Sequence, residues 1–238
     1  MCKKKLISLL DTGIASAEEN MRRDEELLDG LEGEPILHLY RWSFPSLTYG
    51  YFIRPEEWLD LFLLKKSGLD LARRPTGGGL LFHLWDLAFS FLLPASHPKY
   101  STSVLENYRF VNGAVARAVE TCFPHVFPEL APHEVGAGGR FCMAAPTRYD
   151  VIFQGKKIAG AAQRKGRRGY LHQGTISLAL PDFAWIAPLL LPGVRQEVMG
   201  GMERVTVPLL ESLLDLEGAR KNLETHLLFF LQNALCTE

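Results

Sequence analysis

The stretch Arg73-Arg74-Pro75-Thr76-Gly77-Gly78-Gly79 places three successive glycines shortly after two arginines. Three glycines remove every Cβ atom from a turn, so the backbone can lie directly against a ligand. Successive bare N–H groups can hold a phosphate or a carboxylate, and the two guanidinium groups add positive charge beside them. The stretch therefore predicts a backbone loop that binds an anionic group. A tight hairpin turn with solvent-facing arginines is the alternative interpretation.

A second glycine-rich segment, Gly155-Lys156-Lys157-Ile158-Ala159-Gly160, follows later in the chain. Side chains of a strand alternate between its two faces, so only one of Lys156 and Lys157 can enter a pocket. A lysine between glycines has few side chains beside it, so its ammonium group can reach a bound acyl or phosphoryl group. Together the two segments predict a pocket for an activated carboxylic acid, whereas two exposed lysines on a charged turn are the alternative.

The composition is typical of a soluble globular protein. The chain has 238 residues, of which 47% are apolar and 22% charged, and its formal net charge is -1. This charge argues against a nucleic-acid partner held by a general basic field. The apolar patch near the amino terminus is too short for a secretory signal, and no apolar run reaches membrane-spanning length. We therefore expect one cytoplasmic domain over residues 1–238, with neither nucleic acid nor membrane as a partner.

Hydrophobic periodicity predicts strands in hairpin-like runs between helices. Such an order favours an α+β fold with a mixed, mostly antiparallel sheet flanked by helices. Helices are expected at residues 12–30, 55–67, 101–123 and 218–235. Strands are expected at 35–42, 46–52, 70–74, 80–83, 87–93, 149–153, 157–163 and 170–180, with 80–83 and 87–93 forming a hairpin and 136–139 a loop.

Two further features carry open interpretations. His83 follows the glycine turn on an apolar strand, where it is either a functional group or a satisfied core histidine. The basic turn at residues 165–169 is either a solvated hairpin tip or a docking patch for an acidic domain or a phosphate. Cys2, Cys122 and Cys236 show no metal-binding spacing, either with one another or with Cys142.

The two glycine-rich segments resemble the motifs of the lipoate-protein ligase and octanoyltransferase family. The first motif, Arg-Arg-x-Ser/Thr-Gly-Gly followed by apolar residues and a histidine, is matched by residues 73–79 and His83. The second motif is matched at Asp150-Val151, Gly155, Lys157, Ile158, Gly160, Ala162 and Gly174-Thr175. Because both motifs occur in the right order, the resemblance is specific over residues 12–180. In the remaining residues, 181–238, we expect helices without a full accessory domain.

The resemblance implies a catalytic domain like those of class II aminoacyl-tRNA synthetases and biotin ligases. It also implies an enzyme that attaches a lipoyl or octanoyl group to one lysine of a lipoyl domain, in a 2-oxoacid dehydrogenase subunit or in the H protein of glycine cleavage. Lys157 would be catalytic and would stabilise the charge that builds as the acyl carbon becomes tetrahedral. The substrate-binding residues implied are Arg73, Arg74, Thr76, Gly77, Gly78, Gly79, His83, Gly160, Ala162, Gly174 and Thr175.

Two mechanisms follow from the resemblance, and both stay open. A ligase would use ATP and Mg²⁺ to make an acyl-adenylate from lipoate or octanoate, and Asp150 aligns with an acid beside the magnesium-nucleotide site of the ligases. A transferase would carry the acyl chain on a cysteine and need no cofactor. Cys142, four residues before Pro146, resembles the nucleophile of the transferases, and a thiolate there would be favoured by the charge of Lys157. A small buried apolar side chain is the other interpretation of Cys142.

Some residues depart from the family pattern. Leu84 stands where the family often has aspartate, and Gln173 stands where histidine is frequent, which puts local polar contacts in doubt. Tyr149 replaces the asparagine that is usual in the ligases. A protein that binds acyl groups without catalysis is the alternative from a different functional class, although the intact glycine stretch and Lys157 argue against it.

Overall fold

The strands of the protein form two separate sheets. The computed structural model describes residues 6–132, 147–180, 182–205 and 207–236. Its strands are β1 (Ser8–Ala15), β2 (Ile36–Trp42), β3 (Ser46–Tyr49), β4 (Asp70–Arg73), β5 (Leu80–His83), β6 (Asp86–Pro94), β7 (Glu129–Leu130), β8 (Val151–Phe153), β9 (Lys156–Lys165) and β10 (Gly169–Ser177). The larger sheet has the order β1-β2-β6-β10-β9-β8-β7, and the smaller has the order β4-β3-β5. In the larger sheet β1 and β2 run parallel, and the other neighbours are antiparallel.

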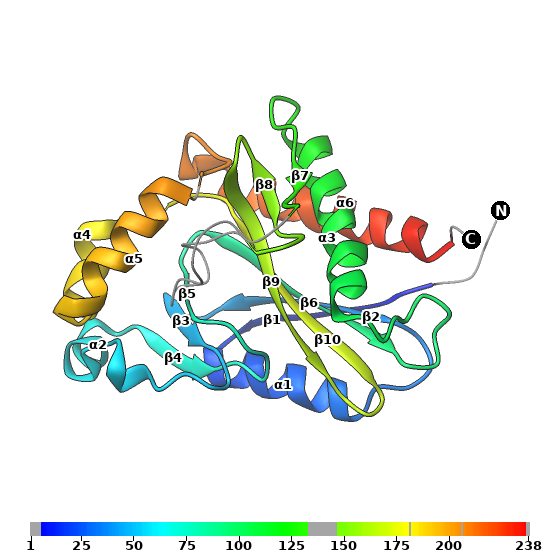
Figure 1. Ribbon diagram of the computed structural model, residues 1–238, viewed down its shortest axis with the longest axis horizontal. Coiled ribbons are helices and arrows are strands. Elements are labelled where there is room, and N and C mark those ends of the chain that lie inside the picture. The colour runs from blue at the N-terminus through cyan, green and yellow to red at the C-terminus, as the bar shows by residue number, and fades with distance from the viewer. Residues whose placement is uncertain (1–5, 133–146, 181, 206, 237–238) are drawn as a thin grey trace.

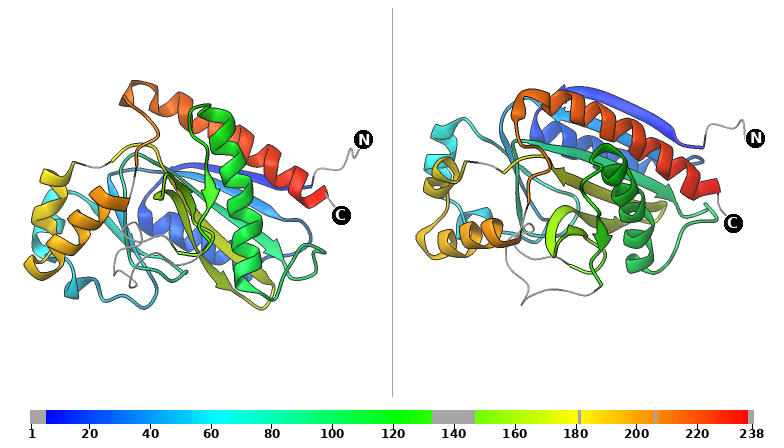
Figure 2. Two further views of the ribbon diagram at one scale, coloured as in Figure 1. Left: turned by 45° about the horizontal axis from the view of Figure 1, so that its top comes forward. Right: turned by 90° about the horizontal axis from the view of Figure 1, so that it is seen from above.

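Helices cover both faces of the larger sheet (Figure 1). The helices are α1 (Ala17–Asp29), α2 (Leu61–Ser67), α3 (Val104–Cys122), α4 (Phe183–Ile186), α5 (Pro192–Val205) and α6 (Leu216–Cys236), with short 3₁₀ turns η1 (Pro55–Glu57), η2 (Ala187–Leu189) and η3 (Leu213–Asp215). Helix α1 packs on one face, whereas α3 and α6 pack together on the opposite face (Figure 2). The smaller sheet shares a separate apolar core with η2 and parts of α2, α4 and α5.

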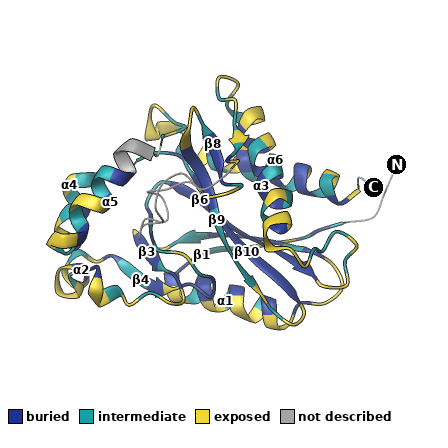
Figure 3. Ribbon diagram, in the orientation of Figure 1, coloured by how far each residue is buried: buried dark blue, intermediate teal, exposed yellow. Residues whose placement is uncertain are grey.

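Strand β6 is buried along its whole length because helices cover both of its faces (Figure 3). Its side chains alternate as the pleat requires. Leu87 and Phe89 join the core beneath α3 and α6, whereas Ala88 and Leu92 pack with α1. A strand covered on two faces is apolar nearly throughout, so the polar Ser90 on the α1 face needs a partner there.

The predicted α+β class and the mostly antiparallel sheet are confirmed. Most predicted elements occur with shifted ends, and β3 stops at Tyr49 instead of residue 52. The loop expected at residues 136–139 lies outside the described residues.

The helix predicted from residue 12 is wrong at its start. Residues 8–15 form β1, which was not predicted and which pairs in parallel with β2. Ser16 caps α1 by accepting a hydrogen bond from the backbone N of Glu19 at 3.2 Å, so the helix begins at Ala17. Ile14, an apolar residue inside the range predicted to be helical, is 73% exposed on the strand.

The hairpin predicted from residues 80–83 and 87–93 is also wrong. β5 pairs with β3 in the smaller sheet, whereas β6 pairs with β2 and β10 in the larger one. The chain therefore crosses from one sheet to the other at residues 84 and 85. Hydrophobic alternation identifies the two strands but does not reveal which neighbours they choose.

The helix predicted over residues 55–67 is divided in two. Pro55–Glu57 forms a 3₁₀ turn, and α2 begins only at Leu61. Asp60 caps α2 by accepting hydrogen bonds from the backbone N of Phe62 and of Leu63. Between them, Leu59 forms an isolated antiparallel bridge with Leu190, which takes its backbone out of the helix. No described helix has the length and apolar character that crossing a bilayer requires.

Gly174 is expected to be required for sheet packing. A Cβ atom at residue 174 would overlap the ring of Phe89, its partner across the β10–β6 pair. We predict that Gly174→Ala lowers the free energy of unfolding by about 1–3 kcal/mol, the usual effect of overpacking. The control is Gly113→Ala on α3, where no atom lies within 4 Å of the added Cβ, and which should raise stability by roughly 0.5–1 kcal/mol. Urea unfolding measures both variants, and equal stabilities would contradict the packing argument.

Candidate active site

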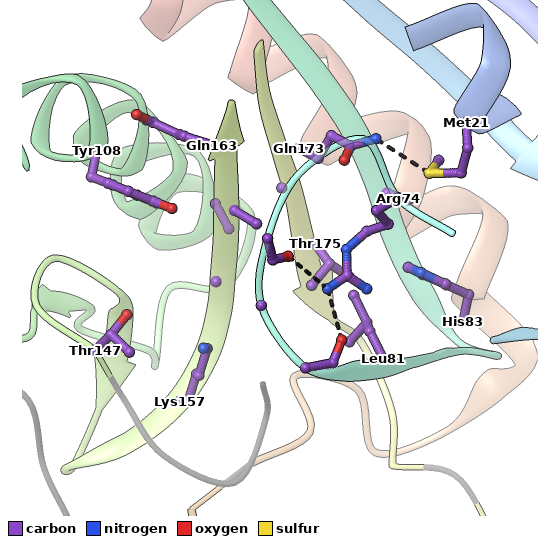
Figure 4. A pocket seen from close by; sticks show the side chains of 18 of the residues that line it. Met21, Arg74, Leu81, His83, Tyr108, Thr147, Lys157, Gln163, Gln173 and Thr175 are labelled. Atoms are coloured by element: carbon purple, nitrogen blue, oxygen red, sulfur yellow. Dashed lines mark hydrogen bonds between the residues drawn. The ribbon is translucent and has the colours of Figure 1, made fainter. Parts of the chain in front are cut away.

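A cavity of about 280 Å³ lies on the α1 side of the larger sheet, beside the smaller sheet. The strands and loops of both sheets contribute to it, together with one residue each from α1 and α3 (Figure 4). The cavity is lined by Met21, Tyr40, Trp42, Arg74, Gly77, Gly78, Gly79, Leu81, His83, Ala88, Tyr108, Thr147, Lys157, Gly160, Ala161, Ala162, Gln163, Gln173, Gly174 and Thr175.

The glycine loop, residues 74–79, joins β4 to β5 and curves around the side chain of Arg74 (Figure 4). Arg74 is buried, and its guanidinium donates to the backbone oxygens of Gly77 at 3.1 Å and Gly79 at 2.9 Å. It also donates to the backbone oxygen and the hydroxyl of Thr48 on β3. Arg74 thus supports the loop from inside, and its guanidinium group is hydrogen-bonded to oxygen atoms of the protein.

Gly50 allows the glycine loop to lie close to the end of β3. Its backbone N donates to the oxygen of Gly79 at 3.2 Å, and a Cβ atom at residue 50 would overlap the backbone oxygen of Gly78. Gly78 itself has φ of +90°, a conformation that favours glycine. The loop shape therefore depends on glycines in two separate segments.

Lys157 enters the cavity from β9, while its neighbour Lys156 is exposed to solvent. Its Nζ atom forms an ion pair with Asp150 at 2.8 Å, and both side chains are almost fully buried. Asp150 also accepts hydrogen bonds from the backbone N and the hydroxyl of Thr147. A Cβ atom at residue 160 would overlap the end of the Lys157 side chain, so Gly160 leaves the room that the ammonium group occupies.

His83 lines the opposite side of the cavity and bonds at both ring nitrogens. Nδ1 lies 2.7 Å from Oδ2 of Asp86, and Nε2 lies 2.8 Å from the hydroxyl of Thr48. Thr175 donates to the same Asp86 oxygen at 2.7 Å. Burial raises the pKa of Asp86, but the charge and hydrogen bond of His83, with help from Thr175 and Arg220, outweigh it, and the pKa lies below its usual value. Asp86 is therefore ionised near neutral pH and holds His83 in place.

The rest of the cavity wall is largely apolar. Its apolar side chains come from α1, β2, β5 and β6 and include Met21, Trp42, Leu81 and Ala88. The Trp42 ring stacks on His83 with ring centres 4.2 Å apart. An ammonium group and bare backbone at one part of the wall, with apolar side chains elsewhere, suit a fatty acyl group with a polar head.

Most residues that the sequence singled out lie at this cavity. Arg74, Gly77, Gly78, Gly79, His83, Lys157, Gly160, Ala162, Gly174 and Thr175 all line it. Thr76 is buried within the glycine loop, and Asp150 is buried at the ion pair with Lys157. Arg73 lies elsewhere, exposed on the surface with its guanidinium 4.7 Å from the ring centre of Tyr51. Cys142 lies outside the described residues.

Sequence reasoning missed several residues that support the loop. Thr48, Asp86 and Gly50 are examples, and Asp24 and His38 form a buried pair at 2.8 Å on the α1 face. The period-two alternation of β2 and β6 could have identified some of them. It places His38 and Ser90 on the same face as apolar neighbours, where an unpaired polar group would be costly.

Residues 16–214 match the lipoyl protein ligase A/B catalytic domain family. Octanoyltransferase LipM of Kyrpidia tusciae is 34% identical and aligns over 89% of this chain and 79% of the relative. Octanoyltransferase LipM of Geobacillus kaustophilus is 33% identical over 75% of this chain and 68% of the relative. The chain belongs to this family.

Solved lipoate-protein ligases share the fold of this family member. A lipoate-protein ligase A structure with bound ATP has a TM-score of 0.69 and 26% identity, over 94% of this chain and 84% of that chain. A T. acidophilum protein described as a lipoate protein ligase, with bound lipoic acid, has a TM-score of 0.71 and 25% identity, over 94% and 85%. The predicted family and fold are confirmed, and the protein is an enzyme of the lipoyl and octanoyl ligase and transferase class.

Gly160 offers a test of how strictly Lys157 must be placed. We predict that Gly160→Ala lowers the acylation rate on the order of 100-fold, because a displacement of about 1 Å of a positioned group has such an effect. The added methyl overlaps the flexible end of Lys157 and lies 3.2 Å from Oδ1 of Asp150, so thermal unfolding must show that the variant is folded at the assay temperature. Gly193→Ala on α5, where the added Cβ meets no atom within 4 Å, is the matched control. A normal rate for Gly160→Ala would contradict the prediction that the reaction depends on the position of Lys157.

Proposed function

We propose that the protein is an octanoyltransferase that moves an octanoyl group from a carrier protein to the lysine of a lipoyl domain. The observation that carries this proposal is that Lys157 and the glycine loop line one cavity whose remaining wall is mostly apolar. The relatives named octanoyltransferase LipM, at 34% and 33% identity, support the transferase rather than the ligase. The acceptors would be lipoyl domains of 2-oxoacid dehydrogenase subunits or of the glycine-cleavage H protein.

In this proposal Cys142 is the nucleophile. Its thiolate attacks the carbonyl carbon of the donor thioester, the bond from that carbon to the donor sulfur breaks, and the donor leaves as a thiol after taking up a proton. The amine of the acceptor lysine then attacks the new thioester, so that an amide forms and the Cys142 thiol is released. Thr147, five residues later in the sequence, lines the cavity, so Cys142 is close in sequence to the site.

Lys157 would stabilise the oxyanion in both steps. Its ammonium group is buried, paired with Asp150 and held at the cavity wall, so its charge acts where water is scarce. The N–H groups of Gly77, Gly78 and Gly79 lie on bare backbone and would contact the acyl headgroup. Ala162, Gly174 and Thr175 would contact the acyl group from the sheet side of the cavity. Met21, Trp42 and Ala88 would surround the acyl chain.

The ATP-dependent ligase is the second candidate, since a solved lipoate-protein ligase A with ATP is 26% identical. Asp150 fits a magnesium site poorly here. Its Oδ2 atom already contacts Lys157 and Thr147, which leaves only Oδ1 without a hydrogen-bond partner among the described residues. The described residues contain no group of three side chains suited to a metal ion. A divalent cation at Asp150 would also be repelled by the adjacent ammonium group.

The experiment that tests this proposal compares acyl donors. The protein is incubated with apo lipoyl domain and either octanoyl carrier protein or octanoate with Mg-ATP, and the mass of the domain is measured. Modification from the carrier without ATP supports the transferase. Modification only with Mg-ATP would replace it with the ligase, and no modification from any donor would indicate an acyl-binding protein without turnover.

The cysteine mechanism predicts that Cys142→Ser abolishes transfer and that the wild-type protein forms a thioester with octanoyl carrier protein, seen by intact mass. Cys122→Ser and Cys236→Ser are the matched controls. Burial raises the pKa of Cys122 to about 11, so it stays a thiol, and Cys236 is exposed at the end of α6. Full activity of Cys142→Ser would eliminate the cysteine route.

Lys157→Ala should remove at least about 2.7 kcal/mol of transition-state stabilisation, by analogy with the loss of one oxyanion donor. Lys156→Ala, which removes the exposed neighbour on the same strand, should transfer the octanoyl group at the normal rate. Because Lys157→Ala also leaves Asp150 buried without its partner, urea unfolding must show that the variant is folded at the assay temperature. Equal rates for the two variants would remove Lys157 from the mechanism.

A further inference from the structure

A buried chain of hydrogen bonds connects α1 with the glycine loop. Thr76, which directly precedes the three glycines, donates its hydroxyl to Oε1 of Gln173 at 2.6 Å. The amide nitrogen of Gln173 donates to Oδ2 of Asp24 at 2.6 Å and lies 3.2 Å from the sulfur of Met21. Gln173 thereby links a side chain of the loop to a carboxylate of α1 across the surface of the larger sheet.

Asp24 is itself held by partners on two strands. His38 on β2 contacts its Oδ1 atom at 2.8 Å, and the hydroxyl of Ser90 on β6 donates to Oδ2 at 2.6 Å. The second ring nitrogen of His38 lies 2.8 Å from the hydroxyl of Thr12 on β1. Asp24, His38 and Ser90 have no exposed surface. A buried polar network in which every member is bonded fixes its parts rigidly, whereas a partly bonded one is costly.

The direction of each hydrogen bond explains why an amide stands at residue 173. The Asp24 carboxylate accepts only, so the side chain facing it must donate. The carbonyl oxygen of the same side chain accepts the hydrogen bond that the Thr76 hydroxyl donates. An amide does both at any pH, whereas an ionised carboxylate of the same shape only accepts. A protonated carboxyl group again does both.

We propose that Gln173 is a positioning residue that holds the glycine loop in its acyl-binding shape by tying Thr76 to the buried Asp24–His38 pair. Gln173 lines the cavity, but in this proposal it acts through Thr76 and the loop rather than on the reacting atoms. The activity measurements below rest on the proposed octanoyl transfer, whereas the exchange measurement does not.

The ionisable groups around this network come from four segments. Asp24 lies on α1, His38 and Tyr40 on β2, Arg74 in the loop and Asp86 on β6. Burial, together with the charge of Asp24, raises the pKa of Tyr40 well above its ordinary value, so its hydroxyl stays neutral in any assay near neutral pH. Asp86 stays ionised, because its pKa lies below its usual value.

The test is the pH dependence of Gln173→Glu. Burial and the adjacent Asp24 carboxylate disfavour ionisation of the new side chain, so its pKa should be raised. Below that pKa the protonated side chain reproduces both hydrogen bonds of the amide, and above it the two carboxylates repel each other. The ratio of variant to wild-type octanoyl transfer should therefore rise as the pH falls, by roughly tenfold for each pH unit above the raised pKa. Using the ratio cancels the pH dependence of the reaction itself.

Four further variants separate positioning from a general structural role. Gln173→Leu should be impaired equally at every pH. Gln196→Glu on α5 is the matched control, because it makes the same charge change at an exposed position and should have the wild-type profile. Thr76→Val removes only the loop end of the link, and Thr76→Ser, which keeps the hydroxyl, should restore the rate. A flat ratio for Gln173→Glu, or full activity of Thr76→Val, would overturn the proposal.

Hydrogen–deuterium exchange provides a measurement that needs no catalysis. Amides of a peptide spanning residues 74–80 should exchange at least several-fold faster in Thr76→Val and Gln173→Leu than in the wild type, with exchange in α3 unchanged. If the wild-type protein transfers an octanoyl group from no donor, the proposed function fails, but the exchange measurement still tests whether Gln173 positions the loop through Thr76. Equal exchange of the loop in all variants would show that Gln173 does not position it.

Discussion

The guanidinium group of Arg74 and the loop that surrounds it are the constraint on which the site depends. A run of glycines has the largest backbone freedom of any sequence, so it holds one shape only when other groups bind it. Arg74 supplies bonds to Gly77 and Gly79 from within, and Thr48 connects this cation to β3. The backbone that faces a ligand is thus ordered before any ligand arrives, which lowers the entropic cost of binding.

The two-sided burial of the larger sheet determines where polar groups can gather. The face under α3 and α6 is mostly apolar, with His172 as a buried polar exception, whereas the α1 face carries His38, Ser90, Gln173 and Thr175 together with the cavity. Each of these side chains is hydrogen-bonded to another segment. The strands that build the core on one side therefore position the site on the other, and loss of packing at β6 would affect both.

The sequence predicted the fold class and most elements because helices and strands have different hydrophobic periods, visible in the apolar alternation of β2 and the apolar spacing of α3. It placed Lys157 and the three glycines together through two ordered motifs. The prediction failed where the structure depends on which strands pair with one another. β1 has a sequence that resembles the start of a helix, and β5 and β6 are adjacent in sequence yet belong to different sheets.

Among site residues, Arg73 and Arg74 look equivalent in sequence, but only Arg74 points into the loop, because neighbouring side chains at the end of β4 face opposite ways. The Asp24–Gln173–Thr76 link could not be predicted, since it joins residues from three distant segments. No local sequence pattern indicates such a contact, although the burial of each polar group implies that it has some hydrogen-bond partner.

The cavity lies at the seam between two sheets that share no strand. Among the described strands no backbone ladder runs across it, and its width is fixed by side-chain bridges such as the bond from Thr76 to Gln173 and the stacking of Trp42 on His83. Evolution could therefore enlarge or narrow this opening by exchanging a few side chains, without rebuilding either sheet. An architecture of this kind suits a family that must accommodate acyl groups of differing bulk on one unchanged framework.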